Sequence, residues 1–234
     1  MLISVWILGF NSSSAQPAPT NSLPAQIATS NSVEKAVRPR LASSLDSFLI
    51  KPGCRIELAA SETLVNTPVA MAFDENRRLF VVEWPGMAAP ELRNRPGRIR
   101  LLEDTDGDGV FDASTVYADN LPGPSGIACY DGGVFVTAGT EIVFLKDTRA
   151  DGIADSRKVV FGGFGSGTAN RPPPEARLTS LAWGLDNRIH GGTAGLGGVV
   201  SAPGGTTTEQ VSLVDSDYAF DHRGAGCRQH PRRP

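Results

Sequence analysis

Residues 99–117, IRLLEDTDGDGVFDASTVY, recur without a gap as residues 142–160, IVFLKDTRADGIADSRKVV. The two copies begin 43 residues apart. In each copy, short apolar runs flank an acidic turn that contains glycine, which is typical of a β-hairpin. A period of about 40–45 residues with four strands in each unit is typical of a β-propeller blade.

A second element recurs beside the first. Residues 68–83, 124–138 and, more weakly, 178–192 each predict a strand, a tight turn and another strand. A helical solenoid is excluded by this strand content. A β-sandwich stays open as an alternative, although it does not predict a gap-free repeat of this length. We therefore predict an all-β protein built from propeller blades of four antiparallel strands.

The repeats predict about three blades, at residues 68–118, 124–161 and 178–220, within a partial propeller that spans residues 43–221. Propellers close with about 4–8 blades, so we expect an incomplete ring and a chain that is a fragment of a longer protein. Residues 222–234 lose the strand alternation and gain several arginines. They are expected to form an aberrant basic tail that contains no strand.

The N-terminus is organised differently from the repeats. Residues 1–10, MLISVWILGF, are apolar, and Ser13 and Ala15 fit the small-x-small cleavage rule, which predicts a signal peptide over residues 1–15 and export of the protein. A short buried segment is the alternative. Ten apolar residues are fewer than the roughly 20 that span a bilayer, so we expect no transmembrane span. Residues 16–42 are mostly Ser, Thr, Asn, Pro and Ala and predict a flexible linker.

Composition excludes several classes of function. Lys and Arg number 22 and Asp and Glu 25, which gives a net charge of −3 and argues against a nucleic-acid partner. The three cysteines, Cys54, Cys129 and Cys227, include no C-x-x-C pair, which excludes a zinc ribbon, a redox dithiol and a c-type haem site in this chain. Their pairing is not predicted.

The first acidic turn predicts a calcium site. Ca²⁺ takes about 6–8 oxygen ligands, and alternate carboxylates in a tight loop supply several of them. Gly109, at the sixth position of the loop, permits a sharp turn. The expected ligands are the side chains at positions 1, 3, 5 and 9 and one backbone carbonyl: Asp104, Asp106, Asp108, Asp112 and the carbonyl of Val110.

An EF-hand does not fit this turn. The twelfth position is Thr115 instead of a bidentate Glu, and the flanking residues predict strands instead of helices. We therefore expect a nine-residue calcium loop at the tip of a β-hairpin. A merely solvated acidic turn is the alternative.

The second acidic turn keeps Asp147, Asp151 and Asp155 but replaces the third-position carboxylate with Arg149. Its guanidinium is expected to occupy the place of the cation and to pair with Asp147 or Asp151. A weak or absent calcium site is therefore expected in this copy.

Four segments carry a family resemblance: FLIKPGCRIELAASETLVNTPVAMAFDENRRLFVVEW, GRIRLLEDTDGDGVFD, FLKDTRADGIAD and LAWGLDNRIHG. In this order they resemble the N-terminal part of the propeller domain of bacterial membrane-bound dehydrogenase-like proteins. That domain is similar to the soluble glucose/sorbosone dehydrogenases, whose six-bladed propellers bind pyrroloquinoline quinone (PQQ) and calcium. The resemblance covers about residues 45–221.

The resemblance implies an exported bacterial protein, in the periplasm or at the cell surface, with calcium and PQQ as cofactors. It implies a sugar or alcohol substrate, and a haem-binding electron acceptor in the complete protein. Catalytic and PQQ-binding residues are not assigned, because His190, His222 and His230 lie in no motif that matches the base of the quinoprotein dehydrogenases. We expect this chain alone to lack complete catalytic machinery. A non-catalytic propeller that binds glycans or protein partners is the alternative.

Overall fold

The computed structural model describes residues 5–10, 48–166, 178–205, 209–214, 216–224 and 226–231. These residues are almost entirely β-strands, as the sequence predicts. The chain divides into two compact units, one formed by residues 4–59 and the other by residues 60–234 with the first three residues. Each unit is described by itself.

In the smaller unit, β1 (Val5–Phe10) and β2 (Cys54–Ala60) form a two-stranded sheet. The predicted linker at residues 16–42 and the predicted cleavage site lie outside the described residues.

The larger unit contains three sheets in which sequential strands pair antiparallel. The first sheet consists of β3 (Pro68–Phe73), β4 (Leu79–Glu83), β5 (Gly97–Glu103) and β6 (Ala113–Leu121). The second is built on β7 (Pro124–Tyr130), β8 (Gly133–Ala138), β9 (Glu141–Lys146) and β10 (Ser156–Phe164). The third consists of β11 (Thr179–Trp183), β12 (Arg188–Gly192), β15 (Ser216–Asp221) and β16 (Arg228–Pro231).

These sheets confirm the prediction of four-stranded antiparallel blades in an incomplete ring. Helical structure is short and lies between β4 and β5, as α2 (Pro85–Ala88) and the 3₁₀ turn η1 (Pro90–Leu92). No helix among the described residues is both long and apolar enough to cross a membrane.

Two strand assignments differ from the sequence prediction. The tail expected to contain no strand includes β16, which pairs with β15 and completes the third sheet; the Gln229 side chain also donates a hydrogen bond of 2.6 Å to Ser216 Oγ. In addition, β13 (Gly198–Ser201) and β14 (Val211–Ser212) extend the second sheet beyond β10 instead of the third. Backbone pairing across the sheet decides both assignments, and the local residue pattern does not show it.

Two apolar cores lie between the three blades, one at each contact between neighbouring blades. Between the first and second blades, Phe80, Ile99 and Leu101 pack with Val136 and Val143, all fully or almost fully buried. Alternate side chains of each strand reach this core, as the two-residue period of a strand requires.

The core between the second and third blades is aromatic. The ring of Phe220 lies 5.4 Å from the ring of Phe135 and 5.4 Å from that of Phe161, both in edge-to-face contact. Burial of each such side chain is worth about 1.5–3 kcal/mol, so these rings hold the two blades together.

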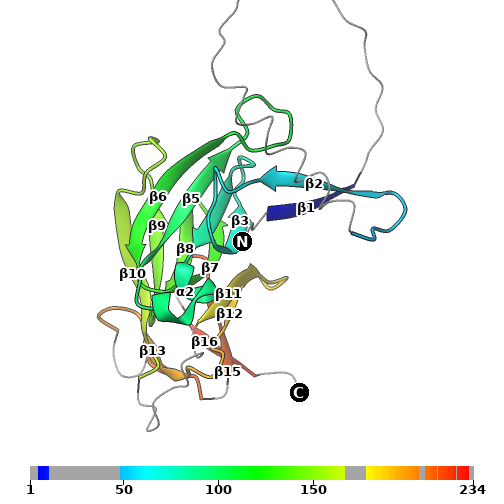
Figure 1. The fold of residues 1–234 in the computed structure, drawn as a ribbon. Coiled ribbons are helices and arrows are strands. Elements are labelled where there is room, and N and C mark those ends of the chain that lie inside the picture. Colours follow the sequence, from blue (N-terminus) through cyan, green and yellow to red (C-terminus); the bar gives the residue numbers. More distant parts are fainter. Residues whose placement is uncertain are drawn as a thin grey trace, which may run out of the picture. The chain divides into compact units, whose positions relative to one another are not determined.

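Several hairpin turns contain residues with a left-handed backbone. Asp131 and Gly132, between β7 and β8, have φ values of 49° and 69°. A two-residue turn with two positive φ angles matches the twist of the flanking strands. In Figure 1, the β5–β6 loop and the β9–β10 loop project from the same end of their neighbouring sheets.

Candidate metal centre

The loop between β5 and β6 is closed at its base by Asp112. This carboxylate accepts hydrogen bonds from the amide of Thr105 at 3.1 Å and from its hydroxyl at 2.7 Å. These bonds lower the pKa of Asp112, chiefly through the hydroxyl of Thr105. Asp112 therefore orders the loop from its base.

Asp104 organises the tip of the loop. Its carboxylate accepts hydrogen bonds from the amides of Gly107 at 2.7 Å and Gly109 at 2.9 Å. Both glycines have positive φ angles, 77° and 91°, which residues with a Cβ adopt at a cost. The chain therefore curls around the Asp104 side chain.

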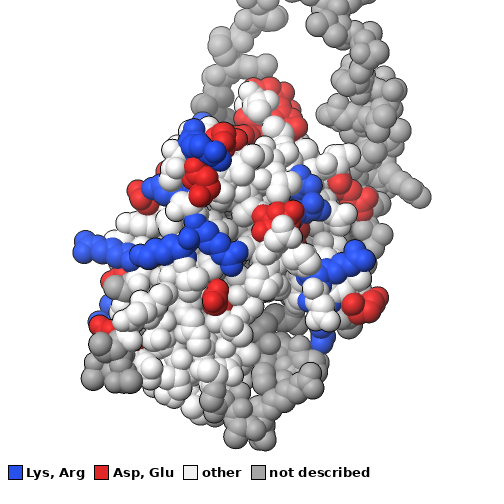
Figure 2. Space-filling model, turned by 90° about the vertical axis from the view of Figure 1, so that its left-hand side faces the viewer, with Lys and Arg blue, Asp and Glu red and all other residues white. Residues whose placement is uncertain are grey.

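The curled loop brings three carboxylates together. Asp104, Asp106 and Asp108 each place one oxygen within 4.8 Å of the others, and no other such group of three His, Cys, Asp or Glu side chains occurs in the described part of the chain. Asp112, also predicted as a ligand, is not in this group of side chains, and the amide of Val110, whose carbonyl was predicted as a ligand, donates a hydrogen bond of 2.8 Å to Asp108. Acidic side chains gather at the upper end of the face shown in Figure 2.

An apolar anchor fixes the loop to its own blade. Phe111 is only 7% exposed although it lies within an acidic loop. Its ring lies 6.3 Å from that of Phe73, the last residue of β3. The carboxylates are thus carried on a loop whose far side is packed, which limits the entropy that a bound ion would have to remove.

The loop between β9 and β10 has the same hydrogen-bonded frame. Gly152 donates its amide proton to Asp147 at 2.8 Å, as Gly109 does to Asp104. Thr148 donates its amide and hydroxyl protons to Asp155 at about 3.0 Å, as Thr105 does to Asp112. The 43-residue sequence repeat is therefore a repeat of three-dimensional structure.

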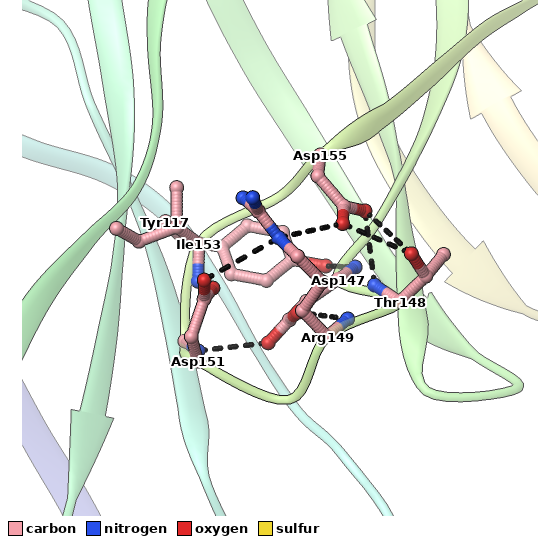
Figure 3. Close-up of polar contacts among 8 residues, drawn as sticks. Tyr117, Asp147, Thr148, Arg149, Asp151, Ile153 and Asp155 are labelled. Carbon is pink, nitrogen blue, oxygen red and sulfur yellow. Dashed lines mark hydrogen bonds and ion pairs between the residues drawn. The ribbon is translucent and has the colours of Figure 1, made fainter.

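Arg149 distinguishes the second loop from the first. Its Nε atom lies 3.0 Å from Asp155 Oδ2 and 3.5 Å from Asp151 Oδ2, and Figure 3 shows the guanidinium between these carboxylates. Of the two predicted partners, Asp151 is confirmed, whereas Asp147 accepts instead a hydrogen bond from the amide of Arg149. Asp155 was not predicted as a partner of Arg149.

The second loop is bound to the first blade through Tyr117, a residue that the sequence analysis did not identify. The amide of Asp147 donates to the Tyr117 hydroxyl at 3.1 Å, and the amide of Ala154 donates to the Tyr117 carbonyl at 2.8 Å. Burial raises the pKa of Tyr117 to about 12, so the hydroxyl stays protonated at neutral pH. In the sequence repeat Tyr117 aligns with Val160. The presence of a hydroxyl where the other copy has an apolar side chain was the one sign in the sequence that Tyr117 makes a polar contact.

A polar pocket of about 380 Å³ adjoins this contact. Arg78 and Lys146 line it together with carboxylates from three turns: Glu75, Asp131 and Asp147. Both cations are paired, since Lys146 lies 2.9 Å from Asp131 and Arg78 lies 2.8 Å from Asp74. The pocket is thus a hydrophilic groove between the first two blades.

The histidines and cysteines form no comparable centre among the described residues. His190 bonds to Asp186 Oδ1 at 2.9 Å, and the ring of His222 packs 5.0 Å from that of Tyr130. Cys129 and Cys227 are not joined by a disulfide, and burial raises the pKa of both thiols. They are half-buried packing residues.

Comparison with known proteins identifies the family without assigning an activity. Residues 40–230 match a family described as a domain of unknown function (DUF7133). The match covers most of the chain, which therefore belongs to this family. No curated protein matches the sequence.

Proposed function

We propose that this protein is an exported calcium-binding β-propeller in which the first acidic loop holds one Ca²⁺. The observation that carries the proposal is the convergence of Asp104, Asp106 and Asp108, with ligand oxygens within 4.8 Å of one another. Three carboxylates at this spacing repel one another strongly unless a cation lies between them. The ion would relieve this repulsion and stabilise the β5–β6 hairpin.

Oxygen-only ligands favour a hard cation, and an exposed set of carboxylates without fixed octahedral geometry favours Ca²⁺ over Mg²⁺. Mg²⁺ requires compact octahedral geometry and releases its water reluctantly, whereas Ca²⁺ accepts irregular sets of about 6–8 oxygens. The group supplies three carboxylate oxygens, fewer than the ion takes, so further oxygens, including water, would complete the shell. This composition matches weak extracellular sites, which bind Ca²⁺ at about 10⁻⁴–10⁻³ M.

Calcium-dependent thermal melting of the full chain tests the proposal. At a free Ca²⁺ concentration ten times the dissociation constant, mass action adds about 1.4 kcal/mol, or roughly 3–6 °C in Tm. Asp108→Ala should remove most of this shift, and the matched Asp151→Ala in the second loop should leave it. Equal responses of the parent protein and Asp108→Ala would show that the first loop is a solvated acidic turn.

The family resemblance also implies a dehydrogenase activity. No residue of this chain is assigned a role in it. His190 bonds to Asp186 and the ring of His222 packs against that of Tyr130, and we assign no catalytic step to either imidazole. The described residues present no set of groups to which the binding of PQQ can be attributed. Reduction of a dye by the PQQ-supplemented chain in the presence of sugars or alcohols would establish the activity directly.

A further inference from the structure

The two acidic loops share one fold but differ in charge at the third position, where the first loop has Asp106 and the second has Arg149. Equivalent hydrogen bonds have almost the same length in both loops. For example, the amide of Thr105 donates to Asp112 at 3.1 Å, and the amide of Thr148 donates to Asp155 at 3.0 Å. The exchange therefore alters the charge of the loop and not its backbone frame.

The Arg149 side chain folds back over its own loop. Its Nε atom lies within ion-pair distance of Asp155 and Asp151, which align with Asp112 and Asp108 of the first loop. A guanidinium carries a permanent positive charge and a rigid fork of donors. The Arg149 guanidinium therefore reduces the repulsion between the carboxylates of the second loop. In the first loop, a bound Ca²⁺ would have this effect.

We infer that Arg149 is a built-in cation that orders the second loop without a metal ion. The loop so ordered then holds the first and second blades together independently of calcium. The second loop contacts the first blade through hydrogen bonds from the amides of Asp147 and Ala154 to Tyr117. Arg149 stabilises these bonds by keeping the loop ordered. Asp147 and Ala150 of the same loop also line the polar pocket, whose wall would keep its shape when calcium is removed.

The inference rests on the proposed function only where it compares the second loop with a first loop that binds Ca²⁺. Removal of calcium should loosen the β5–β6 tip and leave the β9–β10 tip in place. This asymmetry between two loops of the same backbone follows from a single residue.

Amide hydrogen exchange of the full chain in EDTA tests the inference. The amides of Thr148 and Gly152 should be protected in the parent protein and should exchange at least tenfold faster in Arg149→Met. Arg149→Lys should retain part of the protection, because it keeps the charge but loses the fork. Arg157→Met, which removes an exposed arginine from β10, is the matched control and should leave both amides unchanged.

Reciprocal exchanges complete the test. Arg149→Asp should lose protection in EDTA and regain it with Ca²⁺, whereas Asp106→Arg should protect the amide of Gly109 without Ca²⁺. If Arg149→Met is protected like the parent protein in EDTA, the inference is wrong. If Arg149→Met loses protection while amide exchange in the first loop of the parent protein is unchanged by Ca²⁺, the proposed function is wrong and the ordering role of Arg149 stands.

Discussion

The amide of Asp147 donates a hydrogen bond of 3.1 Å to the phenolic oxygen of Tyr117. Tyr117 lies on β6 of the first blade and Asp147 follows β9 of the second, so this bond joins two blades. The same hydroxyl donates to the carbonyl of Leu145 at 3.4 Å. A buried hydroxyl that both donates and accepts stabilises the contact at little cost in desolvation.

Removal of the Tyr117 hydroxyl should therefore destabilise the protein. In Tyr117→Phe the amide of Asp147 loses its partner, which costs about 1–3 kcal/mol for a buried group. Urea denaturation followed by circular dichroism should show a lower midpoint with an unchanged slope. A midpoint equal to that of the parent protein would show that the bond contributes nothing to the blade contact.

The same substitution at Tyr218 should have the opposite effect. Tyr218 is fully buried, and its hydroxyl has no hydrogen-bond partner among the described residues. Tyr218→Phe removes an unpaired polar atom and should raise the free energy of unfolding by up to about 1–3 kcal/mol. A loss of stability in the same urea experiment would reveal a partner for this hydroxyl and refute the prediction.

The aromatic core should be sensitive to truncation. Phe220 is fully buried between the second and third blades, and Phe220→Ala should cost about 3–5 kcal/mol because a cavity remains. Val214, which is 68% exposed, is the control, and Val214→Ala should change stability by less than about 0.5 kcal/mol. Similar losses in the two variants would contradict the packing described between these blades.

Acid should disorder the second loop. Hydrogen bonds from Thr148 lower the pKa of Asp155 below the ordinary Asp value of about 3.9. Because the folded-state pKa is the lower one, this stabilisation is complete above about pH 4 and is lost as the pH falls through the folded pKa. Thr148→Val keeps the amide donor and removes the hydroxyl donor, so a carboxyl NMR titration should show an Asp155 pKa that is partly raised toward the ordinary value. Identical titration curves would show that the hydroxyl contributes nothing to the shift.

Much of this fold follows from local sequence patterns. The runs at residues 133–138 and 141–146 predict β8 and β9 at their observed bounds, because they are rich in β-branched and aromatic residues and are bounded by turns that contain glycine, at residues 131–132 and 139–140. The two acidic hairpin tips and the convergence of Asp104, Asp106 and Asp108 were also predicted. Short-range spacing decides all of these features.

Features that depend on distant pairing were not predicted. The strand β16 has a basic sequence without alternation, and its pairing with β15 alone makes it a strand. The bond between Tyr117 and Asp147 joins two repeats, so no pattern within one repeat indicates it. The participation of Asp155 in the Arg149 ion pair depends on the direction of one long side chain, which spacing does not specify.

The stoichiometry of calcium binding, measured by isothermal titration calorimetry on the full chain, tests the central claim most directly. The account predicts one Ca²⁺ per chain in the parent protein, one in Asp151→Ala, and none in Asp108→Ala, which removes one of the three converging carboxylates. Arg149→Asp should bind a second ion. No heat of binding in the parent protein, or a single site that persists in Asp108→Ala, would contradict the assignment of the first acidic loop as a calcium site.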